Sequence, residues 1–172
     1  MADARSSTVL GSTIGKHRIV KLVGGGVVGR VFACIPMDTA DPARIVAVKV
    51  MRTKFAALGE RLMRERNTLE KVRSQNVVEV HDVAVYSNVP YVVMELVEGE
   101  SLAERLQKGP LQIANALAVA RAIVLGLQAA WAHGLAHGDV RPQNVLLPHG
   151  EFTAAKLGDF LLAQPVEGTE SV

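Results

Sequence analysis

The chain has 172 residues, of which 49% are hydrophobic and 21% are charged, so it can form one domain with a core or two small lobes. Its formal net charge is +2 and it has no long run of like charge, which argues against nucleic acid or an anionic membrane as the main partner. The single cysteine, Cys34, excludes an internal disulfide framework and suits a reducing, cytoplasmic compartment. We interpret Cys34 as a small buried residue of a strand.

The N-terminus and one apolar stretch bear on targeting. Residues 1–15 lack the continuous apolar core of a secretory signal, and we interpret them as a flexible leader. Ile113–Trp131 is apolar enough to be considered as a membrane span, but it contains Arg121, and a central arginine costs about 2.5–3.5 kcal/mol on insertion scales. We therefore expect a helix buried inside a soluble domain and no membrane segment within this chain.

Glycines separate two apolar runs between His17 and Ile35, which predicts two strands joined by a glycine loop. Gly24, Gly26 and Gly29 have the G-x-G-x-x-G spacing, but the β-branched and aromatic residues that follow predict a strand, not the helix of a dinucleotide-binding domain. Two interpretations remain open. The glycines either let backbone amides approach phosphates or only supply positive φ at a hairpin tip.

A lysine in an apolar strand and a glutamate in a helix come next. Ile45–Met51 is an apolar run interrupted only by Lys49, whose ammonium group must either reach solvent or meet an anion. Leu58–Arg73 has apolar residues at helical spacing and contains Glu65. Taken alone, both charged residues are best explained as surface residues.

The following elements complete a first lobe of five strands and one helix and then begin a helical region. Ser87 and Asn88 join two predicted strands, Ser101 and Glu104 have the spacing of a capping box, and Gly134 ends a long helix. The predicted elements are strands over 76–85 and 91–97, a short helix ending at 109–110, a helix over 111–133, and a hairpin of 145–147 with 154–157. We interpret one stripe of the long helix as core: Leu117, Ala120, Val124, Leu127 and Trp131.

Two carboxylates and an amide are grouped near the end of the chain. Asp139 and Asn144 are five residues apart on one segment, and Asp159 follows the predicted hairpin. Oxygen ligands of this kind suit Mg²⁺ beside phosphate groups. The three residues therefore predict a site that handles a metal–phosphate cluster.

In this order, the elements and motifs resemble a eukaryotic-type serine/threonine protein kinase, of the kind also found in bacteria, from about Ile19 to Gln164. The resemblance implies an α+β, two-lobed protein-kinase-like fold. Its N-lobe would be a five-stranded antiparallel sheet plus one helix, over residues 16–97 with the hinge at its end. An incomplete, mainly helical C-lobe would follow over residues 98–164, and a tail over residues 165–172.

The resemblance also implies an ATP site. Gly24, Gly26 and Gly29 would lie over the phosphates, and Lys49 would hold the α- and β-phosphates while pairing with Glu65. The residues implied for the adenine pocket are Val31, Ala47, Met94, Glu95 and Val97, of which Glu95 and Val97 would use backbone groups.

The catalytic groups and partners follow from the same resemblance. Asp139 would accept the proton of the attacking hydroxyl, while Asn144 and Asp159 would hold Mg²⁺. Arg141 stands where these kinases usually have a lysine near the γ-phosphate. The implied reaction transfers the γ-phosphate of ATP to a protein hydroxyl, and the implied partner is a protein substrate or a regulatory protein.

Three departures from the family pattern concern activity. Gly138 replaces the arginine of His-Arg-Asp, so we do not expect control through a phosphorylated activation loop. Leu161 replaces the glycine of Asp-Phe-Gly, which removes the permissive backbone position there. The sequence ends at Val172, before an Ala-Pro-Glu motif or a helical base, so we expect exposed apolar surface on the long helix.

Two alternatives remain open. Gly138 and Leu161 also suit a non-catalytic, pseudokinase-type module that binds nucleotide or acts as a scaffold. The segment His137-Gly138-Asp139, with Asn144 and Asp159, is also similar to aminoglycoside kinases, which phosphorylate small molecules. The glycine spacing and the run of residues 46–49 favour the protein-kinase branch.

Overall fold

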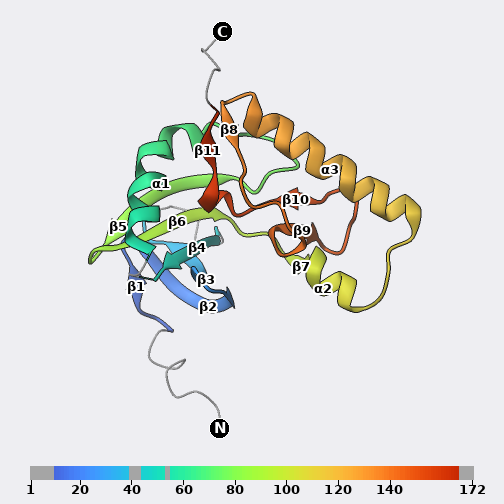
Figure 1. Ribbon diagram of the computed structural model, residues 1–172. Coiled ribbons are helices and arrows are strands. Elements are labelled where there is room, and N and C mark those ends of the chain that lie inside the picture. The colour runs from blue at the N-terminus through green and yellow to red at the C-terminus, as the bar shows by residue number, and fades with distance from the viewer. Residues whose placement is uncertain (1–9, 39–43, 53–54, 167–172) are drawn as a thin grey trace. The chain divides into compact units, whose positions relative to one another are not determined.

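The computed structural model describes residues 10–38, 44–52 and 55–166 (Figure 1). Residues 1–9 of the predicted leader and 167–172 of the predicted tail lie outside the described residues. The chain forms two compact units. Unit 1 comprises residues 1–66 and 80–96, and unit 2 comprises residues 67–79 and 97–172.

Unit 1 is built on a six-stranded sheet with the order β1-β2-β3-β4-β6-β5, in which neighbouring strands are antiparallel. Its strands are β1 (Thr13–Ile14), β2 (His17–Gly25), β3 (Gly29–Pro36), β4 (Val46–Met51), β5 (Val80–Tyr86) and β6 (Val89–Glu95). The five predicted strands are confirmed. The additional strand, β1, lies in the stretch that we interpreted as a flexible leader, and that interpretation is wrong for Thr13 and Ile14. Gly15, at φ +55°, turns the chain so that these residues pair with β2.

The core of unit 1 lies on one face of this sheet. Its buried residues are Ile19, Phe32, Cys34, Val46, Val48, Tyr91 and Val93. They alternate along the strands because successive side chains of a strand point to opposite faces. Cys34 is buried in a strand, as predicted, and burial raises the pKa of its thiol to about 11, which disfavours the reactive thiolate.

The ends of β5 and β6 are fixed by local contacts. Ser87 and Asn88, with φ of +49° and +62°, join the two strands as a tight hairpin. The helix α1 (Ala56–Leu69) is anchored to these strands, because Arg66 forms an ion pair of 2.9 Å with Asp82 of β5. These local contacts define the β5–β6 hairpin and link α1 to β5.

Unit 2 contains two helices, two short 3₁₀ helices and two small sheets, with the orders β10-β9-β7 and β11-β8, among the described residues. The elements are β7 (Gly99–Ser101), α2 (Leu102–Gln107), α3 (Ile113–Trp131), β8 (Leu135–Ala136), η2 (Pro142–Asn144), β9 (Val145–Pro148), β10 (Lys156–Leu157), η3 (Phe160–Leu162) and β11 (Gln164–Pro165). The two predicted helices and the predicted hairpin are confirmed. The long helix ends before Gly134, whose φ is +70°.

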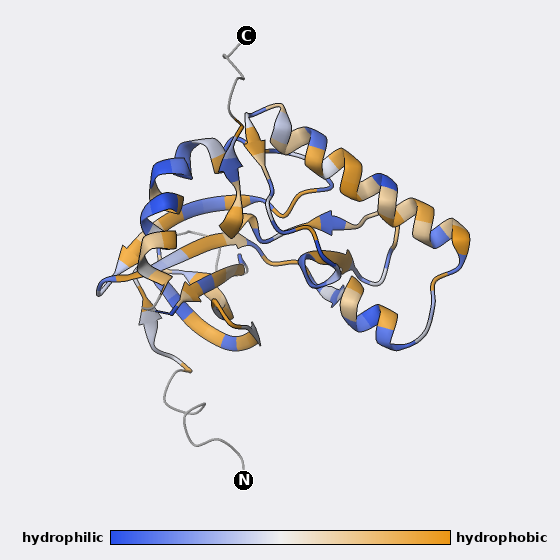
Figure 2. Cartoon of the chain, in the orientation of Figure 1, coloured by the Kyte–Doolittle hydropathy of each residue, from blue (hydrophilic) through white to orange (hydrophobic). Residues whose placement is uncertain are grey.

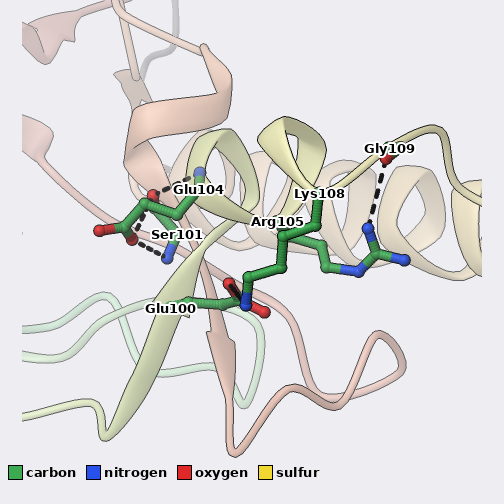
Figure 3. Close-up of polar contacts among 6 residues, drawn as sticks. All are labelled: Glu100, Ser101, Glu104, Arg105, Lys108 and Gly109. Atoms are coloured by element: carbon green, nitrogen blue, oxygen red, sulfur yellow. Dashed lines mark hydrogen bonds and ion pairs between the residues drawn. The ribbon is translucent and has the colours of Figure 1, made fainter.

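The start of α2 is fixed by a capping box (Figure 3). The Ser101 hydroxyl accepts a hydrogen bond from the Glu104 backbone N–H at 3.2 Å, and Glu104 Oε2 accepts one from the Ser101 N–H at 2.7 Å. These bonds satisfy N–H groups that a helix start otherwise leaves unpaired. They also lower the pKa of the Glu104 carboxyl, chiefly through the bond from the Ser101 backbone. The capping box predicted from the sequence is confirmed.

Most of the apolar stripe that we interpreted as the core face of α3 is instead exposed, and only Leu127 of its five residues is half-buried. Leu117, Val124 and Trp131 are 65%, 62% and 56% exposed, and apolar colour runs along α3 in Figure 2. The buried residues of this helix are Val119, Ala122, Gly126 and Ala130. The expected burial of the helix within a domain is therefore wrong, whereas the expected exposure of apolar surface on it is confirmed.

Small residues explain which face of α3 is buried. A Cβ added at Gly126 would lie 2.7 Å from the Asn76 carbonyl oxygen and 3.3 Å from Leu157. The helix therefore packs through a face that has no large side chain at this position. Burying the large residues instead would separate the backbones. By length and composition, α3 is also the one helix in the described part of the chain that could cross a membrane.

Candidate functional site

Four residues predicted for the ATP site of unit 1 share one face of its sheet. Lys49 of β4 lies opposite Val31 of β3, and Ala47 of β4 lies opposite Met94 of β6. Positions two apart on a strand point to the same side, so these residues occupy the face opposite the core cluster. Glu95 follows at the end of β6, where only its backbone is needed for the predicted contact, and Val97 follows as part of unit 2.

The glycine loop, residues 24–29, does not use its glycines for positive φ. None of Gly24, Gly25, Gly26 and Gly29 has φ in the left-handed region, so the interpretation as a hairpin tip that only needs positive φ is wrong. A Cβ added at Gly29 would lie 2.2 Å from the Val50 carbonyl oxygen, so Gly29 permits the close pairing of β3 and β4.

Open space surrounds the two earlier glycines of the motif. A Cβ added at Gly24 or Gly26 would meet no heavy atom within 4 Å. The Gly26 N–H donates to the Gly29 carbonyl at 2.9 Å, which closes the loop at its tip. The loop therefore leaves space beside its backbone, a property that close approach to a ligand requires.

The predicted partner of Lys49 also lies in unit 1. Glu65 is half-buried on α1, next to Arg66, whose ion pair with Asp82 ties this part of the helix to β5. This ion pair links the helix that carries Glu65 to β5. The ion pair between Lys49 and Glu65 remains a prediction.

A buried histidine organises the site in unit 2. His137 is 2% exposed, its Nδ1 accepts a hydrogen bond from the Asp139 N–H at 3.2 Å, and its Nε2 lies 2.9 Å from the Gly158 carbonyl oxygen. Because Nδ1 accepts and a carbonyl can only accept, the ring is neutral with its proton on Nε2. Burial lowers the pKa of His137, which favours the same neutral form. Phe160 packs on the ring, with centroids 4.5 Å apart.

Asp139 is oriented by two nearby side chains. The buried Asn144 donates from Nδ2 to the Asp139 carbonyl oxygen at 2.8 Å and to its carboxylate Oδ2 at 2.9 Å. Arg141 Nε lies 3.2 Å from the same Oδ2. The 3₁₀ helix η2, with Pro142 at its start, sets the spacing between Asp139 and Asn144. Three of the residues predicted from the sequence, Asp139, Asn144 and Arg141, are therefore in direct contact.

The β9–β10 hairpin brings Asp159 to the same place. Val145 pairs with Leu157, and the Gly158 N–H donates to the Asn144 carbonyl at 2.8 Å, so Asp159 directly follows a residue bonded to Asn144. Asp159 itself has φ +65° and ψ +58°. A non-glycine residue in this left-handed region is uncommon and is held there by its surroundings.

The donor set suits a hard divalent cation. The amide nitrogen of Asn144 faces Asp139, so the amide oxygen lies on the other side of the group. Together with the Asp159 carboxylate it could serve as an oxygen ligand, and Mg²⁺ typically binds one or two protein oxygens together with substrate phosphates. The residues present therefore fit this metal.

One residue of this network received no role from the sequence alone. His137 belongs to the stretch that we singled out, but nothing in the sequence indicates that it is buried and bonded at both nitrogens. The sequence feature that could have drawn attention to His137 is its position between the apolar pair Leu135–Ala136 and Gly138. Such a signal suggests a buried residue without indicating its partners.

Comparisons with known proteins agree with this arrangement. Residues 17–172 match the family model for the protein kinase domain. The chain is 33% identical over 159 residues to the serine/threonine-protein kinase PknD of Mycobacterium tuberculosis, covering 90% of this chain and 23% of that protein. It is 35% identical over 167 residues to PknH of Mycobacterium bovis, covering 95% and 27%.

A solved structure gives the same likeness for the fold. The PknI kinase domain of Mycobacterium tuberculosis superposes with a TM-score of 0.79 at 25% identity, covering 90% of this chain and 63% of that one. The chain thus spans about a quarter of the length of the curated relatives described above.

Proposed function

Because the match over residues 17–172 shows that this chain belongs to the protein kinase family, we propose that it transfers the γ-phosphate of ATP to a serine or threonine hydroxyl of a protein. The observation that carries the proposal is the orientation of Asp139 by Asn144 and Arg141. Phosphoryl transfer needs positioning and charge neutralisation more than covalent chemistry. Because ATP is the donor, we propose the cytoplasm as the location of the reaction.

Asp139 is the proposed base. Its Oδ2 is engaged by Asn144 and Arg141, which leaves Oδ1 directed away from them toward an incoming hydroxyl. A general base must first lie within reach of the proton that it accepts, and these contacts hold the carboxylate in one orientation. Arg141 approaches Asp139 through its Nε, and its two terminal nitrogens are the groups we propose for the γ-phosphate.

Asn144 and Asp159 are the proposed ligands of Mg²⁺. When bound, the ion neutralises the charge of the phosphate oxygens. In unit 1 we propose that Lys49, paired with Glu65, holds the α- and β-phosphates under Gly24, Gly26 and Gly29. The remaining proposed contacts are to the adenine: Val31, Ala47, Met94, and the backbones of Glu95 and Val97.

Asp139→Asn tests the proposal. We expect transfer of labelled phosphate from Mg·ATP to a generic protein substrate to fall by about 10²–10⁴-fold, because an amide cannot accept the proton. Binding of Mg·ATP should persist. Asp38→Asn is the matched control, since Asp38 is an exposed acid that contacts only Lys16 among the described residues. Unchanged transfer by Asp139→Asn would refute the assigned base.

A second candidate is a non-catalytic nucleotide-binding module, and one observation favours it. Leu161 is 5% exposed within η3, so the turn after Asp159 contains a buried side chain and lacks the permissive backbone position of a glycine. This candidate predicts binding of Mg·ATP with no phosphate transfer to proteins or to small hydroxyl compounds. Transfer that disappears in Asp139→Asn would exclude it.

A further inference from the structure

Gly138 allows two backbone segments of unit 2 to touch. Its φ is +80°, and an added Cβ would lie 2.5 Å from the Leu162 carbonyl oxygen, 3.2 Å from its carbonyl carbon and 3.4 Å from its Cβ. Real Cβ atoms do not approach another backbone this closely, so any side chain at this position would displace η3.

The segment around Leu162 is folded back along the chain that precedes Asp139. Strand β11 pairs with β8, with Gln164 opposite Ala136, and the Val166 N–H donates to the Gly134 carbonyl at 2.8 Å. The Ala163 N–H closes η3 by donating to the Phe160 carbonyl at 3.0 Å. Residues 160–166 are thus held by the chain that precedes Gly138 and by the turn within η3.

Asp159 lies between two fixed points. On one side, Gly158 is bonded to His137 and to the Asn144 backbone. On the other side, η3 begins at Phe160 and ends at Leu162, against Gly138. A left-handed Asp is unfavourable by itself, so it persists only where both neighbours are constrained.

We propose that Gly138 is a positioning residue for Asp159: the space left by its missing side chain seats the Leu162 carbonyl, and the turn seated there holds the Asp159 carboxylate ready for a divalent cation. The buried Leu161 anchors the same turn from within. The cation-binding part of this proposal rests on the proposed function.

Amide hydrogen exchange of the whole 172-residue chain tests the seating of the turn. We expect Gly138→Ala to speed exchange at the Ala163 and Val166 amides by about tenfold or more, since local opening exposes them. Gly150→Ala is the matched control, because Gly150 has nearly the same φ, +79°, but an added Cβ there meets nothing within 4 Å. Equal exchange in the two variants would overturn the proposal.

A second pair of variants guards against a general loss of folding. Leu161→Ala should also speed exchange at Ala163, whereas Leu162→Ala should not, because the Leu162 side chain is 40% exposed and its carbonyl is retained. Equal effects of these two variants would likewise overturn the proposal.

The affinity for ATP, measured with and without Mg²⁺, tests the positioning role itself. Gly138→Ala should leave metal-free ATP affinity unchanged and reduce the gain from Mg²⁺ by about tenfold, the effect expected when support of a metal ligand is lost. An unchanged gain would refute the positioning role. If the wild-type chain gains nothing from Mg²⁺, the proposed function fails, while the exchange comparison still decides whether Gly138 seats the turn.

Discussion

The glycine loop and the segment around Gly138 use the same residue type for opposite purposes. At Gly24 and Gly26 an added Cβ would meet nothing within 4 Å, so these glycines leave space. At Gly138 the Leu162 backbone occupies the position that a side chain would take, so this glycine permits close packing of two backbone segments. Gly29, within the G-x-G-x-x-G spacing itself, behaves like Gly138. Spacing alone therefore does not distinguish a ligand-approach glycine from a packing glycine.

The two regions also differ in what holds them. Strand pairing and two backbone hydrogen bonds hold the glycine loop: the Gly26 N–H donates to the Gly29 carbonyl, and the Arg52 N–H donates to the Val28 carbonyl. Residues 137–144 are held through His137, which bonds at both ring nitrogens only while neutral. The stability of the glycine loop should therefore be insensitive to pH, whereas the stability of residues 137–144 should depend on pH.

The largest expected effect is that of Gly29→Ala. A Cβ 2.2 Å from the Val50 carbonyl oxygen and 3.2 Å from Met51 Cα would separate β3 from β4. We expect the free energy of unfolding to fall by about 2–3 kcal/mol, near the upper end for overpacked sites. Urea unfolding followed by circular dichroism measures the loss, and a change under about 0.5 kcal/mol, as at an ordinary surface site, would contradict the packing role.

The next effect, smaller than that of Gly29→Ala, comes from pH. Burial lowers the pKa of His137, so the unfolded chain takes up this proton at a higher pH than the folded chain. The free energy of unfolding should therefore decrease as pH falls below about 6.5, the usual value for histidine, and should stop changing once the pH is below the folded pKa.

A pair of histidine variants assigns this pH dependence. In His137→Gln the decrease should be absent, whereas His133→Gln should retain it, because His133 is exposed after α3. Urea unfolding measured at several pH values between about 5 and 8 makes the comparison. A pH dependence that survives in His137→Gln would show that another group causes it.

Much of the fold could be predicted because its signals are local. Alternation and apolar runs predict the strands of unit 1, and the Ser101–Glu104 pair predicts the start of α2. The buried face of α3 could not be predicted in this way. Hydrophobicity points to its large residues, such as Leu117, but the helix packs through Gly126, because closeness to the Asn76 backbone matters more there than side-chain area.

The candidate site likewise has features that could be predicted from the sequence and features that could not. The contact of Asp139 with Asn144 could be predicted because the two residues are five positions apart on one segment. The location of Asp159 could be predicted because it follows the β9–β10 hairpin. The role of His137 could not, because it depends on the carbonyl of Gly158, twenty-one residues away in sequence. The contact of Gly138 with Leu162 also depends on residues distant in sequence.

The smallest effect on stability is expected for Gly26→Ala, and it separates the two uses of glycine most clearly. The backbone of Gly26 is not left-handed and the space beside it is open, so alanine fits and should leave stability unchanged or raise it by about 0.4–1 kcal/mol. If the loop lies over phosphates, the added methyl group should nevertheless weaken Mg·ATP binding several-fold, because it occupies the space that backbone amides need for close approach.

Thermal unfolding measures the stability of Gly26→Ala, and titration calorimetry on the same preparation measures its affinity for Mg·ATP. Gly150→Ala, where an added Cβ also meets nothing within 4 Å, should leave ATP affinity unchanged. Wild-type affinity in Gly26→Ala would mean that the open space of the loop does not serve the nucleotide.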